Sequence, residues 1–381
     1  MIPFLNNTIL KRYKGKTCLL RVDLNISFKD ESGLFRLESI IPTIQLLLKH
    51  RIKVVLVSHR GHPPIGGLMA EDKRFSLKSF APLIEHRIKK EVAFMKDSDV
   101  KILKKKILES KSSVILLENV RFFKGEESNN LHFANELSTL ADFYVNDAFA
   151  VSHRSHASVS SITHYIPSYA GPLMKMEIEH LDGAIKKTKH PFVVVIGGAK
   201  ISDKLNIMKY FWNNADRFLL GGGPANTLFK IQGFPIEKSL VDFNTSSEMK
   251  KYAASSKTRL PSDVVFSKGR ILDIGRKTRE QYAKILSLAR TIVWNGPMGL
   301  FERRQFAEGT ETVWRAILGN RKARIIIGGG ETIASSNLIP GFKKNLRHHK
   351  NIFISTGGSA MLDYLSGKKL PGIEALKKNW K

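Results

Sequence analysis

The sequence has one cysteine, no low-complexity tract and few acidic residues for its length. Cys18 alone can form neither an intrachain disulfide nor a cysteine-based metal cluster, so we expect a reducing compartment. Residues 1–7 lack the basic start and apolar core of a signal peptide, and no apolar run reaches the length of a membrane span. We therefore expect a cytoplasmic protein that does not enter a membrane.

The shortage of acidic residues leaves the chain strongly basic. Its 62 Lys and Arg outnumber 34 Asp and Glu, which gives a net charge of +28 with histidine neutral. Such a charge favours anionic partners, namely phosphorylated metabolites, nucleic acid or anionic lipid, and does not specify a fold. A lysine-rich genome would give the same total. The charge alone therefore does not establish nucleic-acid binding, and any such binding is expected to be non-specific.

Two common nucleotide-binding schemes are also missing. The chain has neither the G-x-x-x-x-G-K-[ST] P-loop nor the catalytic motifs of protein kinases. Residues 221–223 are three glycines that match a dinucleotide-binding fingerprint only loosely, because Asn226 stands where the final glycine belongs. These observations disfavour a dehydrogenase.

The chain does contain a regular alternation of predicted strands and helices. Its 381 residues, 42% of them apolar, suffice for two domains with cores of their own. Strands of the first half are predicted over residues 17–23, 53–58, 113–117 and 143–145, and helices over residues 38–49, 76–89 and 131–140. Such alternation predicts a parallel sheet covered by helices.

The predicted strand ends of the first half share a chemistry of cations and hydrogen-bond donors. Those side chains are Arg21, Arg36 (just ahead of the helix at 38–49), His59, His62, Arg121, His153, Arg154 and His156. The two H-x-x-H pairs could suggest a metal site, but neighbouring guanidinium groups would oppose a dication, so anion binding is the better interpretation. Asp23 and Glu118 could act as acids or bases, and we prefer a role in orienting the arginines.

Residues 191–204 open the second half with a different kind of strand end. Five unbroken apolar residues, 192–196, are typical of a strand buried on both faces of a parallel sheet. Gly197 and Gly198 follow, and Lys200 and Lys204 flank the start of a predicted helix. Taken alone, this could be an ordinary strand-to-helix turn with two solvated lysines.

Four more predicted strands of the second half also end in glycine-rich turns. They cover residues 218–220, 291–294, 325–327 and 352–355. Because ligands of open α/β sheets bind outside the carboxyl ends of strands, five such turns predict a rim where backbone and helix amino termini meet a nucleotide. Residues 167–187 combine proline, glycine and an amphipathic helical pattern, which predicts the link between the two halves.

Nine short motifs, in order and over nearly the whole chain, resemble phosphoglycerate kinase. They are RVDLN at 21–25, SHRGHP at 58–63, LENVRF at 117–122, YVNDAF at 144–149, HRSHAS at 153–158, GGAKISDK at 197–204, WNGPMGLFE at 294–302, GGGET at 328–332 and STGG at 355–358. The resemblance implies an α/β fold of two Rossmann-like domains, with helix-flanked parallel sheets, a hinge helix and a cleft between them. The implied parts are a glycerate-binding domain (1–168), an interdomain helix (169–188), a nucleotide-binding domain (189–365) and a tail returning to the first domain (366–381).

The resemblance also implies an activity: reversible phosphoryl transfer between 1,3-bisphosphoglycerate and MgADP, giving 3-phosphoglycerate and MgATP, after closure of the hinge. It implies Arg36 and Lys200 as catalytic residues and a monomer that uses Mg²⁺ with ATP or ADP. The implied glycerate-binding residues are Asp23, Asn25, Arg36, His59, His62, Arg121, His153, Arg154 and His156. The implied nucleotide-binding residues are Gly198, Lys200, Lys204, Gly222, Asn295, Glu302, Gly329, Gly330, Glu331, Thr332, Gly357 and Gly358, with Glu331 contacting the metal.

The chain departs from the family pattern in four places. His62 replaces an arginine, Glu331 replaces an aspartate, and Ser359 replaces the third glycine of STGGG. The connection before residues 273–278 is short and Arg276 replaces a proline, so we expect a trimmed loop there. Altered glycerate binding, altered metal preference and a crowded phosphate rim are the respective expectations.

Two other functions stay open at this level. One is a divergent family member with weak catalysis that acts mainly as a basic binding protein for anionic polymers, whose binding should fall steeply with salt. The other is a different small-molecule phosphotransferase, which the glycerate-side motifs disfavour.

Overall fold

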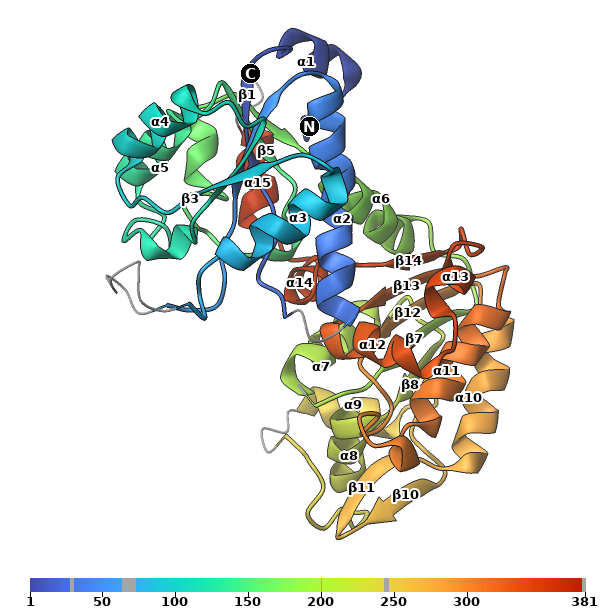
Figure 1. Cartoon of the computed structure of the whole chain (residues 1–381). Coiled ribbons are helices and arrows are strands. Elements are labelled where there is room, and N and C mark those ends of the chain that lie inside the picture. The colour runs from blue at the N-terminus through green and yellow to red at the C-terminus, as the bar shows by residue number, and fades with distance from the viewer. Residues whose placement is uncertain (28–30, 64–72, 200, 243–246, 379–381) are drawn as a thin grey trace. The chain divides into compact units, whose positions relative to one another are not determined.

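The structure is a computed structural model that describes residues 1–27, 31–63, 73–199, 201–242 and 247–378 (Figure 1). The chain divides into two compact units, which we call unit 1 (Met1–Ile178 and Lys369–Lys381) and unit 2 (Glu179–Lys368). Each unit is an α/β structure built on its own six-stranded sheet. Among the described residues no helix is long and apolar enough to cross a membrane.

The sheet of unit 1 is parallel throughout and has the strand order β3-β4-β2-β1-β5-β6. The strands are β1 (Thr17–Arg21), β2 (Lys53–Val57), β3 (Val92–Met95), β4 (Val114–Leu117), β5 (Phe143–Asn146) and β6 (Ser168–Ala170). The four strands predicted from sequence are the inner ones, β1, β2, β4 and β5. The edge strands β3 and β6 were not predicted, because three of the four residues of β3 are only partly buried and β6 is three residues long.

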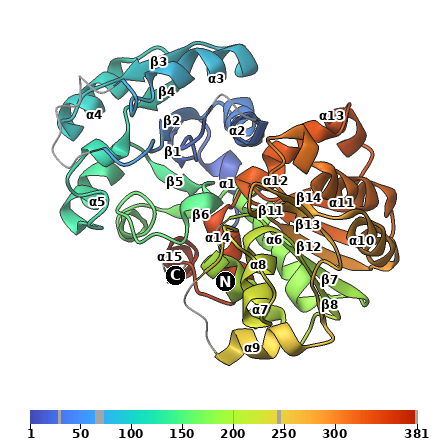
Figure 2. The same cartoon turned by 90° about the horizontal axis from the view of Figure 1, so that it is seen from below.

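The helices of unit 1 cover both faces of this sheet (Figures 1 and 2). They are α1 (Asn7–Arg12), α2 (Glu31–Lys49), α3 (Ala81–Ile88), α4 (Val100–Glu109), α5 (Leu131–Ser138), α6 (Pro172–Lys186, shared with unit 2) and α15 (Pro371–Lys378), with short 3₁₀ turns η1 (Lys78–Phe80), η2 (Val120–Phe122), η3 (Phe149–Val151) and η4 (Ser161–His164). Because side chains alternate along a strand, Leu20 packs with α2 and α3 on one face. Leu19 packs with α4 and α5 on the other.

Helix α2 begins at Glu31, seven residues earlier than predicted, so the expectation that Arg36 precedes the helix was wrong. Leu37 is fully buried and extends the buried stripe of Ile40, Ile44 and Leu47 by one turn, which explains why the helix continues. Arg36 is therefore held by the helix itself.

The sheet of unit 2 is also parallel, with the order β14-β13-β12-β7-β8-β9. Its strands are β7 (Phe192–Ile196), β8 (Arg217–Leu220), β9 (Thr258–Arg259), β12 (Thr291–Asn295), β13 (Arg324–Gly328) and β14 (Ile352–Ile354). Its helices are α7 (Ile201–Phe211), α8 (Gly222–Ile231), α9 (Ser247–Ala254), α10 (Arg276–Leu288), α11 (Glu308–Gly319), α12 (Gly330–Ala334), α13 (Phe342–Leu346) and α14 (Ser359–Leu365), with 3₁₀ turns η5 (Arg304–Phe306) and η6 (Ser335–Leu338). Every residue of β7 is buried, as its unbroken apolar sequence predicts.

The segment expected as a trimmed loop is a β-hairpin. Strands β10 (Val264–Ser267) and β11 (Arg270–Ile274) pair in antiparallel fashion outside the main sheet. The two connecting residues, Lys268 and Gly269, both have positive φ, 50° and 73°. This is the conformation of a type I′ turn, whose twist matches that of the paired strands.

Candidate active site

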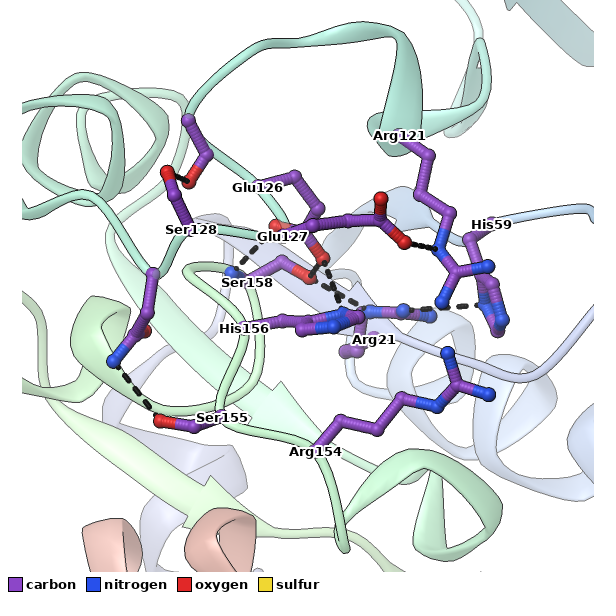
Figure 3. Close-up of polar contacts among 12 residues, drawn as sticks. Arg21, His59, Arg121, Glu126, Glu127, Ser128, Arg154, Ser155, His156 and Ser158 are labelled. Atoms are coloured by element: carbon purple, nitrogen blue, oxygen red, sulfur yellow. Dashed lines mark hydrogen bonds and ion pairs between the residues drawn. The ribbon is translucent and has the colours of Figure 1, made fainter. Parts of the chain in front are cut away.

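A cluster of basic side chains lies at the carboxyl ends of the strands of unit 1. We call Arg21, His59, Arg121, Arg154 and His156 the basic cluster. Arg21 ends β1, His59 follows β2, Arg121 lies in η2 after β4, and the last two follow β5. Figure 3 shows the guanidinium groups of Arg21, Arg121 and Arg154 and the ring of His59 turned toward one another. The strand order therefore brings together residues that are up to 135 positions apart, from Arg21 to His156.

Glu126 and Ser158 hold Arg21 in place, and sequence reasoning missed both. The Ser158 hydroxyl accepts from Nε of Arg21 at 2.9 Å and donates to Oε1 of Glu126 at 2.6 Å. Glu126 is fully buried, also accepts from the backbone N–H of Ser158, and lies 3.8 Å from Nδ1 of His156. Glu126 thus fixes the hydroxyl that holds Arg21, and burial raises the pKa of its carboxyl group. No local pattern marks it, because its partners are distant in sequence.

Arg121 contacts the histidine that departs from the family pattern. Its Nη1 donates to the carbonyl of Gly61 and lies 3.1 Å from Nδ1 of His62. Its Nε lies 3.0 Å from Oε1 of Glu127, and the same oxygen is 3.8 Å from Nδ1 of His62. The His62 side chain is 70% exposed, whereas Arg121 is buried. His62 therefore lies at the solvent edge of the basic cluster.

Burial and mutual repulsion depress the basicity of this cluster. Burial, followed by the charge of Arg21, lowers the pKa of His59 well below its usual value. Burial and then Arg121 lower the pKa of His156 to about 3. Burial and then Arg154 lower the pKa of Arg121 to about 10. The positive potential is therefore strong, and both histidines are neutral at pH 7.

Three buried donors of this region have no hydrogen-bond partner among the described residues. They are Nε2 of His59, Nη2 of Arg121 and Nε of Arg36. An unsatisfied buried donor is costly, and native structures keep one mainly where an absent group completes it. Donors surrounded by arginine charge are suited to an anion such as a phosphate or a carboxylate.

Asp23 and Asn25 position the neighbouring groups. Nη1 of Arg36 donates to Oδ2 of Asp23 at 3.3 Å, so the prediction that Asp23 orients an arginine is confirmed. Asn25 donates its backbone N–H to Asp23 and accepts from the backbone N–H of Gly61 at 2.8 Å. These contacts join the end of β1 to the loop that carries His59.

The same expectation for Glu118 was wrong. Its carboxylate accepts from the backbone N–H groups of Leu77 and Asn119 and from the hydroxyl of Ser76. It therefore anchors the chain just before η1.

His153 lies beside the basic cluster. Its Nε2 is 3.3 Å from Nε of Arg154. Across the described ranges, no group of three or more His, Cys, Asp and Glu side chains could hold a metal ion.

The glycine-rich turns of unit 2 border a cavity of about 380 Å³. Of the predicted nucleotide-binding residues, Gly198, Gly222, Glu302 and Glu331 line it. Gly198 and Gly222 have φ of +80° and +54°, which glycine adopts without strain. The backbone N–H of Gly223 donates to the carbonyl of Gly198 at 3.0 Å, so two turns pack backbone against backbone.

Several lining residues of this cavity were not predicted. Lys238 and Arg270 add positive charge to it. Leu240 and Leu300 are 54% and 37% exposed and offer apolar surface, which suits the flat face of a base. Leu300 lies within the WNGPMGLFE motif, whereas Lys238, Leu240 and Arg270 carried no signal of their own.

Other predicted residues of unit 2 lie outside the described lining of the cavity. They are Lys204, Asn295, Gly329, Gly330, Thr332, Gly357 and Gly358. Lys204 is a buried residue of α7, and the hydroxyl of Thr332 accepts from the backbone N–H of Gly296 at 2.7 Å. The amide of Asn295 is buried next to Gly329 without a hydrogen-bond partner in the described part of the chain. Lys200 lies outside the described residues.

Ser359, expected to crowd the phosphate rim, begins α14 and is exposed. It lines a separate cavity of about 160 Å³ together with Asn206 and Lys368. The effect of this serine on the nucleotide rim stays a prediction.

Comparisons with known proteins agree with this arrangement. The sequence model of the phosphoglycerate kinase family matches residues 9–368. Phosphoglycerate kinases of Dictyoglomus turgidum and Moorella thermoacetica are 38% and 39% identical to the chain, covering 96% and 95% of it and 96% of each relative. The solved phosphoglycerate kinase structure from Coxiella burnetii covers all of both chains with a TM-score of 0.80 and 33% identity. The one from Pyrococcus horikoshii covers 97% of both chains with a TM-score of 0.82 and 33% identity. The chain therefore belongs to the phosphoglycerate kinase family.

Proposed function

We propose that the protein is a phosphoglycerate kinase, which transfers a phosphoryl group reversibly between 1,3-bisphosphoglycerate and MgADP to give 3-phosphoglycerate and MgATP. The observation that carries this proposal is the set of open donors on His59 and Arg121, in the basic cluster, and on Arg36, which Asp23 holds just after β1. 3-Phosphoglycerate is a small dianion or trianion with a phosphate and a carboxylate. Such a ligand would satisfy donors that the described chain leaves open.

In this proposal, unit 1 binds the glycerate and unit 2 binds the nucleotide. The glycerate contacts Asp23, Asn25, Arg36, His59, His62, Arg121, His153, Arg154 and His156. The nucleotide contacts Gly198, Lys200, Lys204, Gly222, Asn295, Glu302, Gly329, Gly330, Thr332, Gly357 and Gly358. Support for the second assignment comes from the cavity, whose exposed leucines suit a base and whose glycine backbone leaves room for phosphates.

The metal belongs next to Glu331. Its carboxylate lines the cavity beside Gly198, and carboxylate oxygen is the donor that Mg²⁺ prefers. A single carboxylate fits, because Mg²⁺ in such sites is held by one or two carboxylates together with substrate phosphates. When bound, Mg²⁺ would neutralise charge on the transferring phosphate.

The chemistry requires positioning and charge stabilisation more than proton transfer. The acceptor in the ATP-consuming direction is a carboxylate, which is already ionised at neutral pH, so no general base is needed. We assign Arg36 to the transferring phosphoryl group from the glycerate side, where Asp23 orients its guanidinium. Lys200 takes the corresponding role on the nucleotide side by resemblance to the family.

Donor and acceptor bind to different units in this proposal, so in-line transfer requires closure of the hinge, which would also exclude water from the acyl phosphate. We assign the hinge to residues 169–188, the two domains to residues 1–168 and 189–365, and residues 366–381 to a tail that returns to the first domain. A cytoplasmic monomer completes the proposal.

A coupled assay with ATP, Mg²⁺ and 3-phosphoglycerate tests this function. The wild-type chain should turn over, and Arg36→Gln should lose nearly all activity. Arg87→Gln is the matched control, because Arg87 also donates to a carboxylate, that of Glu38, and its side chain is 20% exposed against 18% for Arg36. No turnover by the wild type, or equal losses in both variants, would contradict the proposal. The first outcome would favour the alternative of a basic binding protein, which the comparisons do not favour.

A further inference from the structure

Unit 2 has a second, larger cavity. It lies at the end of the sheet opposite the glycine-rich turns. Its volume is about 480 Å³. Arg290 and Thr291 line it at the start of β12, Arg324 at the start of β13, and Asn351 just before β14. Because these strands are parallel, their amino ends share one edge, and the glycine-rich turns occupy the other. The cavity is therefore separate from the site assigned to the nucleotide.

Six of the eleven residues that line this cavity, which we call the amino-edge cavity, are cationic. Its cations are Lys187, Lys189, Arg290, Lys322, Arg324 and Lys350. Glu179 is the one carboxylate of the lining. Among the described residues none of these six cations is paired with a carboxylate, although the chain forms ion pairs at many other places. Uncompensated like charges repel one another, and a bound anion would remove that repulsion.

Hydrogen bonds order the backbone of the loops that carry several of these cations. The N–H of Arg324 donates to the carbonyl of Arg290 at 2.8 Å, and the N–H of Arg290 donates to Pro191 at 2.8 Å. In the next loop, the side chain of Asn320 accepts from the N–H groups of Lys322 and Ala323 at 3.0 Å each. The loops that carry three of the cations are thus ordered before any ligand arrives, which lowers the entropic cost of binding.

Helix α6 forms one wall of the cavity. Nη1 of Arg324 donates to the carbonyl of Gly183 at 2.6 Å, and a Cβ on this glycine would collide with the guanidinium. The ring of His180 stacks on Phe353 with centroids 4.2 Å apart. Burial and then Arg324 lower the pKa of His180, so it is a neutral hydrogen-bonding group at pH 7. This wall therefore adds polar contacts without adding negative charge.

The shape and lining favour a small ligand over a polymer or a membrane. The lining contains no large apolar side chain that could receive an acyl chain. Its cations come from four separate segments and converge on one concave volume, whereas a nucleic-acid backbone is usually met by a stripe or groove of charge. A volume of this size is typical of small-molecule sites.

We propose that the amino-edge cavity binds a small polyanion with two or more phosphate groups, either an inorganic polyphosphate or a nucleoside polyphosphate. The proposal does not depend on the kinase activity, because no residue of this cavity is assigned to substrate binding or to catalysis, although Glu179, His180 and Lys187 belong to the segment assigned to the hinge. Arg324, whose guanidinium donates to the carbonyl of Gly183, and Arg290 supply positive charge at the strand ends, and Lys322 and Lys350 supply it from neighbouring loops.

Calorimetric titration of the full chain with inorganic tripolyphosphate tests the proposal. In Lys322→Gln/Lys350→Gln the dissociation constant should rise at least about tenfold, since each charged hydrogen bond lost contributes about a factor of ten. The matched control is Lys11→Gln/Lys14→Gln, which removes the same charge from a smaller cavity of unit 1 also lined by Lys49, His50 and Arg51. That variant should bind tripolyphosphate as the wild type does.

Equal affinity for tripolyphosphate in the wild type and both variants would overturn the proposal. An equal loss of affinity in both variants would also overturn it, because it would show a general effect of charge and not a site. A second titration with ATP identifies the source of the phosphates. If Lys322→Gln/Lys350→Gln loses affinity for both tripolyphosphate and ATP, the site recognises the phosphates alone. If it loses affinity for ATP only, the ligand is a nucleoside polyphosphate. If the same variant loses affinity for an RNA oligonucleotide but for neither tripolyphosphate nor ATP, the choice of a small ligand is overturned. Kinase activity of the same proteins, measured in parallel, tests the proposed function separately.

Discussion

Two glycines, one at each end of α8, test whether the glycine-rich turns bind the nucleotide. One of them is the test position and the other is its control. Gly222 begins the helix and has φ +54°, and Gly233 follows its end and has φ +82°. A Cβ on Gly222 would come within 2.9 Å of the carbonyl oxygen and 3.0 Å of the nitrogen of Gly198. A Cβ on Gly233 would meet nothing within 4 Å. Alanine at either position therefore imposes the same backbone strain, but only Gly222→Ala disturbs the rim.

The magnitudes follow from these two terms. Left-handed backbone costs a non-glycine residue about 1 kcal/mol, so Gly233→Ala should lose about 1 kcal/mol of unfolding free energy. Gly222→Ala adds the cost of overpacking against rigid backbone, about 1–3 kcal/mol, for a total of about 2–4 kcal/mol. Because the displaced backbone belongs to the proposed nucleotide site, the KM for ATP should rise at least about tenfold in Gly222→Ala only.

Urea unfolding followed by tryptophan fluorescence measures the stability term. Trp212, Trp294 and Trp314, three of the four tryptophans, lie in unit 2 and report on its unfolding. The coupled kinase assay measures the KM for ATP and, as an internal comparison, the KM for 3-phosphoglycerate. An unchanged KM for ATP in Gly222→Ala, or an equal rise in Gly233→Ala, would refute the assignment of this turn to the nucleotide.

Three further predictions concern single side chains. His62→Arg restores a permanent charge with bidentate geometry beside Arg121, so the KM for 3-phosphoglycerate should fall about tenfold; an unchanged KM would contradict this. Burial raises the pKa of Asp147 to about 6, so the native chain binds more protons than the unfolded chain above pH ~4, and stability falls as pH rises to about 6. Asp147→Asn should remove this loss of stability. The drop in unfolding free energy from pH 4 to pH 7, measured by urea titration, should be about 3 kcal/mol smaller in the variant than in the wild type, and an equal drop in both proteins would contradict the reasoning. Glu331→Asp should raise activity with Mg²⁺ relative to Mn²⁺, because Mg²⁺ tolerates poor geometry badly, and identical ratios in both proteins would rule out a role for the extra methylene.

The strands that the sequence predicted are the ones whose burial is complete. The inner strands β1, β2, β4 and β7 consist almost wholly of buried residues, so an unbroken apolar run marks each of them. The edge strands β3 and β6 and the two-residue β9 were missed, because short or half-exposed strands leave no such pattern. Helix α4 was missed as well. Its buried Val100, Leu103 and Ile107 are separated by lysines, and the lysine run was interpreted only as a cluster of charge.

The site divides in a similar way. The sequence by itself determined which residue types end the strands: arginine and histidine in the first half, glycine in the second, and with them the family. Those residues directly follow apolar runs in the sequence, so their chemistry can be recognised before the fold is known.

Only the tertiary structure decided which of these groups meet, and which others complete them. Glu126 reaches Arg21 through Ser158, and Glu118 holds the backbone of Leu77 in place of an arginine. The amino-edge cavity likewise collects cations from loops more than 160 residues apart, Lys187 and Lys350 among them. The physical reason is that periodicity reports local burial, whereas the order of strands in a sheet sets which of their ends are neighbours.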